Sequence, residues 1–155
     1  MEEIRDKVIR NDFEIKNIEV FSLNIPLKKP IKMSGITVQN AENIIVKNSR
    51  AEFNVAGIEI ENSYYADVFD NYAANNTGGI LVFDLPDIPQ QGGHHVRVFR
   101  NKAINNNTDN FAPEGNIVGE VPRGMGILVQ ASSHVEIFDN DIGDNDTINI
   151  AIVTY

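Results

Sequence analysis

The stretch Val135–Asn145, VEIFDNDIGDN, decides the fold because its pattern occurs four times in the chain. The earlier copies are VRVFRNKAINN from Val96, ADVFDNYAANN from Ala66 and NIIVKNSRAEF from Asn43. Each copy is a short β-branched run followed by an Asn-rich turn, and Asn suits turns because it tolerates the left-handed backbone conformation. Aligned on a shared asparagine, the copies predict one column of stacked turn residues: Asn48, Asn71, Asn101 and Asn140.

A second apolar phrase follows each copy of this pattern. The phrases are AGIEI from Ala56, GGILV from Gly78, GMGILV from Gly124 and INIAIV from Ile148. The whole unit repeats with a period in the twenties, lengthened by the insertions DLPDIPQQGG and TDNFAPEGNIVGEVPR, which is typical of a solenoid. Insertions of this kind are expected to loop out from the stack of coils, where loops often carry function.

Composition excludes several classes of function. The 155 residues allow one domain of ordinary size, and a net charge of −9 without clusters of Lys and Arg argues against a nucleic-acid partner. The absence of cysteine excludes disulfides and thiolate metal sites. No apolar run approaches the roughly 18 residues of a membrane-spanning helix. The amino terminus has no apolar core of a secretion signal, so the sequence leaves localisation open.

The columns of the repeat predict which side chains point into the core. Counted back from the shared asparagine, one column is β-branched in every copy and is expected to be buried: Ile45, Val68, Val98 and Ile137. Two polar columns alternate in sign from coil to coil: Asp67, Arg97 and Glu136, and Asp70, Arg100 and Asp139. Exposed ion pairs contribute only about 0–1 kcal/mol each. We therefore interpret these columns as a solvated face whose charges oppose slippage of the register.

A column of aromatic residues is the first candidate binding surface. Phe69, Phe99 and Phe138 follow the core column directly, with Val46 at the same place in the first copy. Strict alternation points the three rings outward, where they would form a platform for sugar rings. A bulge that turns the column inward, or coverage by the amino-terminal segment, is the structural alternative.

The insertion in the third repeat is the second candidate surface. It combines an acid, an amide, an aromatic ring and a cation that together suit sugar binding: Asp109, Asn110, Phe111 and Arg123. Stacking also places His94 or His95 near His134, but no carboxylate is expected beside them. The acids Asp139, Asp141, Asp144 and Asp146 follow turn chemistry and lack calcium-loop spacing. No metal site, no cofactor and no catalytic residue is therefore predicted.

With these phrases in view, residues from about 40 to 155 resemble right-handed parallel β-helix proteins of the carbohydrate-binding and sugar-hydrolase type. The phrases that carry the resemblance are AEFNVAGIEIENS, NNTGGILVFDLP and NNNTDNFAPEGNIV. The resemblance implies an all-β fold, a right-handed parallel β-helix of about four coils, consistent with the right-handed crossing of parallel strands. Its members are often exported, and none of their catalytic residues matches a position here.

The amino-terminal part resembles a different family. Ile15–Lys47 looks like the first strands of the capping domain of enolase-superfamily enzymes of the mandelate racemase and muconate lactonising type. The two resemblances together suggest a chimera, in which Ile15–Gly35 would cover the open first coil. We therefore predict a tail and capping segment over 1–39 and the β-helix repeats over 40–155.

Three functions follow as hypotheses. The first is a non-catalytic binding or structural module that engages polysaccharide, without a nucleic-acid or membrane partner. The second is a polysaccharide lyase, epimerase or hydrolase of the β-helix type. The third is an inert truncated or chimeric scaffold. The open last coil predicts either a monomer or a homodimer paired edge to edge.

Overall fold

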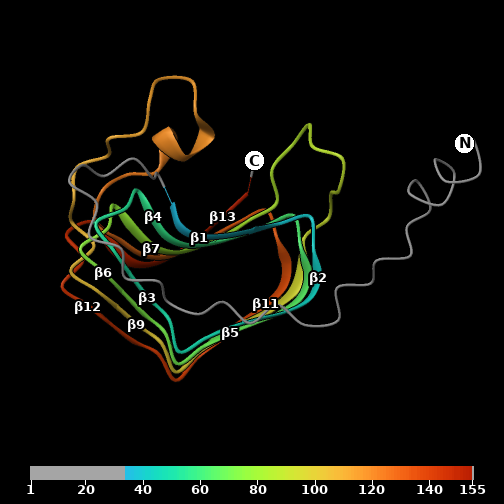
Figure 1. Ribbon diagram of the computed structural model, residues 1–155, viewed down its shortest axis with the longest axis horizontal. Helices are drawn as coiled ribbons and strands as arrows, with labels where there is room; N and C mark the ends of the chain where they lie inside the picture. Colours follow the sequence, from blue (N-terminus) through green and yellow to red (C-terminus); the bar gives the residue numbers. More distant parts are fainter. Residues whose placement is uncertain (1–33, 155) are drawn as a thin grey trace, which may run out of the picture.

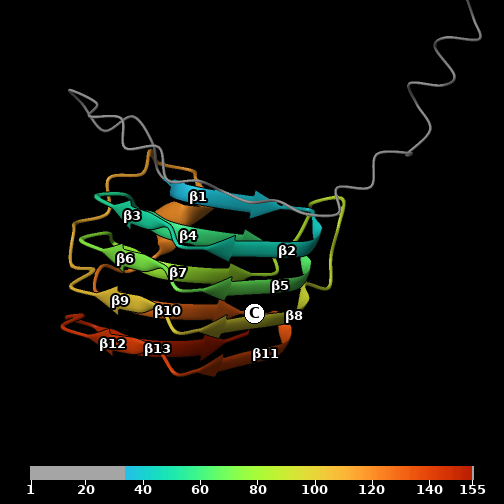
Figure 2. The same cartoon turned by 60° about the horizontal axis from the view of Figure 1, so that its bottom comes forward.

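The computed structural model describes residues 34–154, which wind into a stack of parallel coils (Figures 1 and 2). The first sheet contains β1 (Ser34–Gln39), β4 (Ala56–Glu61), β7 (Gly78–Phe83), β10 (Met125–Gln130) and β13 (Ile148–Val153). The second contains β2 (Glu42–Lys47), β5 (Tyr64–Phe69), β8 (His94–Phe99) and β11 (Ser133–Phe138). The third contains β3 (Arg50–Glu52), β6 (Tyr72–Ala74), β9 (Lys102–Ile104) and β12 (Asp141–Gly143).

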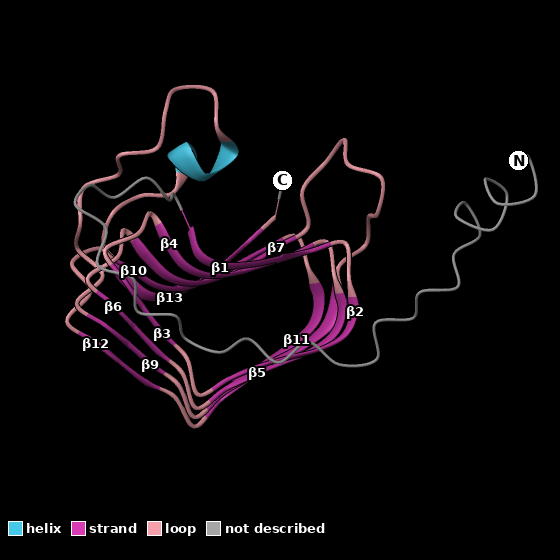
Figure 3. Cartoon of the chain, viewed as in Figure 1, coloured by secondary structure: helices cyan, strands magenta, loops and turns pink. Residues whose placement is uncertain are grey.

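Each strand pairs in parallel with the equivalent strand of the next coil, so the chain forms a right-handed parallel β-helix, as predicted. The two insertions leave the stack at different corners, one between β7 and β8 and one between β9 and β10 (Figure 1). The second insertion holds the 3₁₀ helix η1 (Ile117–Glu120), drawn in Figure 3. Within residues 34–154, no helix is long and apolar enough to cross a membrane.

Columns of aliphatic side chains fill the space between the three sheets. Val68 and Val98 are fully buried, as predicted, and pair with each other in register. Val46 pairs with Val68 on one side, and Ile137 pairs with Val98 on the other. Ile58, Ile80 and Ile127 supply the facing column from the first sheet. Each fully buried side chain of this kind stabilises the fold by roughly 1.5–3 kcal/mol, so the core columns are the main source of stability.

The predicted register was wrong by one residue in the first copy. Val46, and not Ile45, pairs with Val68, and Ser49, and not Asn48, stands in the asparagine column. Asn48 is exposed with a φ of 52° and is equivalent to Asp70, Arg100 and Asp139, which share this left-handed conformation. The same shift places Lys47, and not Val46, beside Phe69. The physical reason is that Asn48 suits the left-handed turn position even better than the buried column beside it.

The asparagine column itself forms a hydrogen-bonded ladder through the stack. The Ser49 backbone N–H donates to Asn71 Oδ1 at 3.0 Å, Asn71 Nδ2 donates to Asn101 Oδ1 at 3.0 Å, and Asn101 Nδ2 donates to Asn140 Oδ1 at 3.0 Å. Each asparagine amide also donates to a backbone carbonyl of the preceding coil, as Asn101 does to Val68. Successive ladder residues are 22, 30 and 39 positions apart in the sequence, because the second and third intervals contain the insertions. The hydrogen bond from a backbone N–H to the next Oδ1 is present in all three intervals, so the insertions do not disturb the ladder.

A second ladder, which the sequence analysis did not identify, runs five residues further along each coil. Asn54, Asn76, Asn106 and Asn145 are linked by side-chain hydrogen bonds of 3.0 to 3.2 Å. Glycines of the first sheet lie against this ladder: a Cβ atom on Gly79 would stand 2.8 Å from Asn106 Nδ2 and 2.5 Å from the Gly126 carbonyl oxygen. These glycines are therefore required by close approach between coils.

The two ends of the stack differ in exposure. In the first coil Val38, Ile44 and Val46 are buried, whereas Ile150 and Ile152 of the last coil are 41% and 75% exposed. β1 lies within the predicted segment 1–39 and is the first strand of the five-stranded sheet. The predicted cap, Ile15–Gly35, falls almost entirely outside the described residues and stays a prediction, as does the division into 1–39 and 40–155.

We expect Val98→Asp to unfold the domain. Val98 is fully buried between Val68 and Ile137, and an unpaired buried carboxylate costs several kcal/mol, a large part of the roughly 5–15 kcal/mol that stabilises a typical domain. The measurement is thermal unfolding followed by far-ultraviolet circular dichroism. His95→Asp, on the exposed side of the same strand, is the control and should melt close to the parent protein. A cooperative melt of Val98→Asp within a few degrees of the parent would refute the register.

We also expect Asn101→Ala to lower the free energy of unfolding by roughly 2–4 kcal/mol. The variant leaves the two Asn71 N–H donors and the Val68 carbonyl acceptor buried without their hydrogen-bond partner. Asn48→Gly is the matched control, since glycine accepts the left-handed conformation of this exposed position. Urea unfolding measures both variants. If Asn48→Gly were as damaging as Asn101→Ala, Asn48 would belong to the ladder after all.

Candidate functional site

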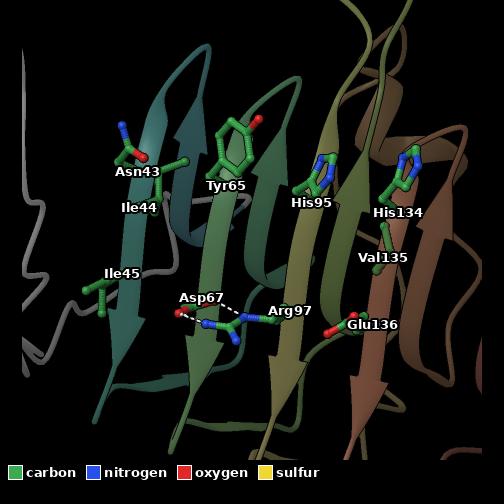
Figure 4. Close-up of a pocket in the computed structure, with 10 residues that line it drawn as sticks. All are labelled: Asn43, Ile44, Ile45, Tyr65, Asp67, His95, Arg97, His134, Val135 and Glu136. Carbon is green, nitrogen blue, oxygen red and sulfur yellow. Dashed lines mark hydrogen bonds and ion pairs between the residues drawn. The ribbon is translucent and has the colours of Figure 1, made fainter.

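The outer face of the second sheet carries an ordered grid of side chains. Between the buried residues of β5, β8 and β11, three residues of each strand point outward, and they stand in register from coil to coil. The grid consists of Tyr65, Asp67 and Phe69 on β5, His95, Arg97 and Phe99 on β8, and His134, Glu136 and Phe138 on β11. Equivalent residues of the three strands form three rows: Tyr65, His95 and His134, then Asp67, Arg97 and Glu136, then the three phenylalanines. The first two rows line a groove of about 690 Å³ (Figure 4).

The first row consists of aromatic rings held on strained backbone. Tyr65, His95 and His134 have φ values of 56°, 56° and 52°, in the left-handed region, which histidine enters more often than most residues and tyrosine rarely occupies. The same position in the first coil is Asn43, a residue type that adopts this conformation readily. The Tyr65 and His95 ring centroids are 5.1 Å apart, and those of His95 and His134 are 4.7 Å apart with the planes nearly parallel. The predicted proximity of these histidines is therefore confirmed.

The second row forms the polar floor of the groove. Arg97 donates from Nε and Nη2 to the two carboxylate oxygens of Asp67, at 2.7 and 2.5 Å. These hydrogen bonds, and then the charge of Asp67, raise the pKa of Arg97 above its ordinary value. Glu136 lies on the other side of Arg97 (Figure 4) and makes no hydrogen bond or ion pair within the described part of the chain. The floor thus contains one closed ion pair and one open carboxylate.

The third row is the predicted phenylalanine column. The ring centroids of Phe69 and Phe99 are 5.0 Å apart and those of Phe99 and Phe138 are 4.9 Å apart, in parallel stacks. Arg100 lies over the rings of Phe69 and Phe99, with its guanidinium carbon 5.3 and 4.8 Å from their centroids. The column does point away from the core, yet the rings cover one another, so Phe99 is 9% exposed while Phe138 is 40% exposed. A ligand therefore meets mainly the ring of Phe138.

The predicted cluster of the third-repeat insertion lies elsewhere. Arg123 pairs with Asp109 and with Asp146, both at 2.8 Å, and Phe111 is 40% exposed. The Asn110 side chain organises its own loop, donating to the carbonyls of Val118 and Val121 and accepting from the Ala112 N–H. None of these residues lines the groove on the second sheet. The two surfaces that the sequence analysis identified are thus separate.

The same insertion covers part of the first sheet. Val118 and Val121 pack on Leu81, Phe83 and Leu128. Beside them lies a smaller, mainly apolar groove of about 420 Å³, bounded by Leu85 of the other insertion and by Ile117 and Pro122. This groove offers few hydrogen-bonding groups and has no counterpart among the predicted sites.

The remaining acids of the fourth repeat have a structural partner or lie in turns. Asp141 lies 3.3 Å from Lys102, and Asp139 and Asp144 occupy left-handed turn positions. Over residues 34–154, no group of three or more His, Cys, Asp or Glu side chains is arranged to hold a metal ion.

With this geometry in place, comparison with known proteins gives the family. A family model described as "Right handed beta helix region" matches residues 5–155. The chain belongs to this right-handed β-helix family. A search of curated proteins and a search of solved structures found no match. The match to the β-helix family spans Ile15–Lys47 as well, and no finding tests the resemblance of that segment to an enolase-type cap.

The sequence did not predict that two glutamates of this β-helix are buried. Glu59 and Glu61 on β4 are 3% and 9% exposed, and accept hydrogen bonds from Thr37 Oγ1 at 2.9 Å and from Gln39 Nε2 at 2.7 Å. Burial, and then the charge of Glu59, raise the pKa of Glu61 above its ordinary value. In the sequence these acids look exposed, because the phrase AGIEIE alternates apolar and charged residues as a half-exposed strand does.

The raised pKa of Glu61 predicts a pH-dependent stability. The folded state binds the carboxyl proton of Glu61 more tightly than the unfolded state does. The stability that this proton contributes is therefore lost as the pH rises from the ordinary pKa of 4.5, which applies to the unfolded state, through the raised pKa of the folded state. We expect Glu61→Gln to raise the melting temperature at about pH 7 and to have little effect at about pH 4. Glu42→Gln, at an exposed position, is the control. A stabilisation by Glu61→Gln of equal size at both pH values would contradict the role of burial.

Proposed function

We propose that this β-helix protein is a non-catalytic polysaccharide-binding module, and that the groove on the outer face of its second sheet is the binding surface. The observation that carries the proposal is the row Tyr65, His95 and His134, three exposed rings held in the left-handed conformation where Asn43 stands in the first coil. Left-handed backbone recurs at other corners of the coils, for example at Phe53, Arg100 and Ala131, so the conformation itself belongs to the fold. What supports the proposal is that three exposed rings stand in register at such a corner, where a ring residue costs roughly 1–3 kcal/mol. Stability alone would favour asparagine or glycine at these positions.

The arrangement of the first two rows suits a glycan chemically. A sugar ring has an apolar face, which packs on aromatic rings, and a rim of hydroxyl groups, which need both donors and acceptors. Tyr65, 52% exposed, and the two histidines supply rings, while Asp67, Arg97 and Glu136 supply donors and acceptors alongside. Equivalent residues of neighbouring coils repeat every ~4.8 Å, so the groove presents the same pair of surfaces along its length, which suits an extended polymer.

The electrostatics of the groove favour binding over catalysis. A lyase or epimerase needs a cation to neutralise the substrate carboxylate, and Arg97 in the groove is already engaged by both oxygens of Asp67. A hydrolase needs a pair of carboxyl groups, one on each side of the scissile bond. On the groove floor Asp67 is held by Arg97, so Glu136 is the one carboxylate there without a direct ion pair among the described residues. The proposal therefore assigns no catalytic residue.

The test is titration with a panel of neutral, N-acetylated, amino and uronate oligosaccharides. The chain has no tryptophan and four tyrosines, so tyrosine fluorescence reports on binding near Tyr65, and calorimetry compares variants. We expect the double variant Tyr65→Asn/His134→Asn to lose at least about fivefold in affinity, because two ring contacts are removed. The same variant should unfold at equal or higher urea concentration, since asparagine relieves left-handed strain of ~1 kcal/mol or more.

Phe111→Ala is the matched control, because this ring is exposed on the third-repeat insertion and lies outside the groove. Loss of binding by Phe111→Ala with no change in the double variant would transfer the site to the insertion. Absence of binding to every oligosaccharide would favour an inert scaffold. Release of reducing ends or unsaturated products from a polysaccharide would show an enzyme and refute the non-catalytic role.

A further inference from the structure

We propose, building on the polysaccharide-binding function above, that the glycan carries protonated amino groups, as a polymer of glucosamine with free amines does. The inference comes from the charges that the groove leaves unpaired. Asp67, Arg97 and Glu136 form its floor, and the formal charges of these three side chains sum to one negative charge. The chain as a whole carries a net charge of −9, so the surrounding field has the same sign.

The charge of Arg97 is already offset by Asp67, which leaves Nη1 as its open donor group for an anionic ligand. Its Nε and Nη2 groups are bound to the two oxygens of Asp67, and a bidentate guanidinium–carboxylate pair is among the stronger side-chain interactions. A uronate or sulfated glycan would have to bind Nη1 alone or displace Asp67, while approaching the open carboxylate of Glu136. Both effects oppose binding of an anion.

Glu136 has the complementary property. Its side chain is exposed on β11, lines the groove, and has no hydrogen-bond or ion-pair partner among residues 34–154. In the preceding coils the same column is closed, because Asp67 is held by Arg97. Arg97 stands beside Glu136 in register, but its hydrogen bonds go to Asp67. A cation placed on the other side of Glu136 would continue the alternation of charge along the column and supply the direct ion pair that Glu136 does not make.

Exposed aromatic rings flank this carboxylate on the same face of β11. His134 lies two residues before Glu136 and Phe138 two residues after it, so all three side chains point outward. Phe138 is 40% exposed and stacks on Phe99 through one face. A carboxylate with an adjacent ring is a combination that attracts an ammonium group, through ion pairing and through the cation–π interaction. The groove, with Phe138 just outside it, thus combines surfaces for sugar rings with a position for an amine.

A lysine-rich peptide presents the same charge, but the groove favours a glycan. Its first row consists of three ring systems repeated along the stack, which suit the flat faces of successive sugars, whereas a flexible peptide would lose more conformational entropy on binding. A cationic peptide is therefore included in the experiment as a competing ligand.

The experiment compares five probes by calorimetry on the full chain: hexamers of glucosamine, N-acetylglucosamine, glucose and galacturonate, and hexalysine. We expect the glucosamine hexamer to bind most tightly, with an affinity that falls as the ionic strength rises from about 0.01 M to about 0.15 M and the Debye length shortens from roughly 30 to 8 Å. Glu136→Gln should weaken this ligand by about threefold to fivefold and leave the N-acetylated hexamer unchanged, since the variant removes one exposed charge–charge contact.

Glu114→Gln is the matched control, because it removes the same charge from an exposed position on the third-repeat insertion, outside the groove. Equal affinity for the glucosamine, N-acetylglucosamine and glucose hexamers, together with no effect of Glu136→Gln, would overturn this inference and leave the polysaccharide-binding function intact. Failure of all four oligosaccharides would overturn both. Binding of hexalysine that depends on Glu136, without binding of the glucosamine hexamer, would replace the glycan by a cationic peptide.

Discussion

The asparagine ladders are the constraint on which the rest of this structure depends. At each corner of a coil the chain bends from one sheet to the next (Figure 1) and leaves polar groups buried beside an aliphatic core, where an unsatisfied group costs about 1–3 kcal/mol. Asn71 and Asn101 meet this need twice, since each donates to a backbone carbonyl of the preceding coil and to the asparagine of the next. The second ladder, through Asn76 and Asn106, does the same at the following turn.

The repeat, the parallel coils and most of the core could be predicted because they follow from a period that sequence displays directly. The register of the first copy could not be read from one asparagine column, since Asn48 and Ser49 both fit a turn. A second column would have decided it. The ladders lie five residues apart in every coil, at 71 and 76, 101 and 106, and 140 and 145, and only Ser49 has an asparagine, Asn54, at that distance.

The candidate site could be predicted only in part, for reasons that differ from residue to residue. Alternation correctly placed the phenylalanine column and the column of Asp67, Arg97 and Glu136 on the outside, but it could not show that Phe99 is covered by its neighbours. The row Tyr65, His95 and His134 was not identified as a surface because it lies at a left-handed corner, a conformation that the residue types conceal and that other corners of the fold share. Asn110 suggested a ligand contact by its type, whereas its amide closes its own loop through three carbonyls.

The outward-facing grid of the second sheet and the ladder are linked by the two-residue period of a strand. Because Val68 and Val98 must face the core, Asp67, Phe69, Arg97 and Phe99 must face outward, and a slip of one residue would exchange the two sets. The first coil shares the backbone of the others, yet it presents Asn43, Ile45 and Lys47 on this face, so the scaffold does not by itself require rings there. The aromatic row in the later coils is therefore not required by the fold, and its position is set by the hydrogen-bonded asparagine ladder at the turns.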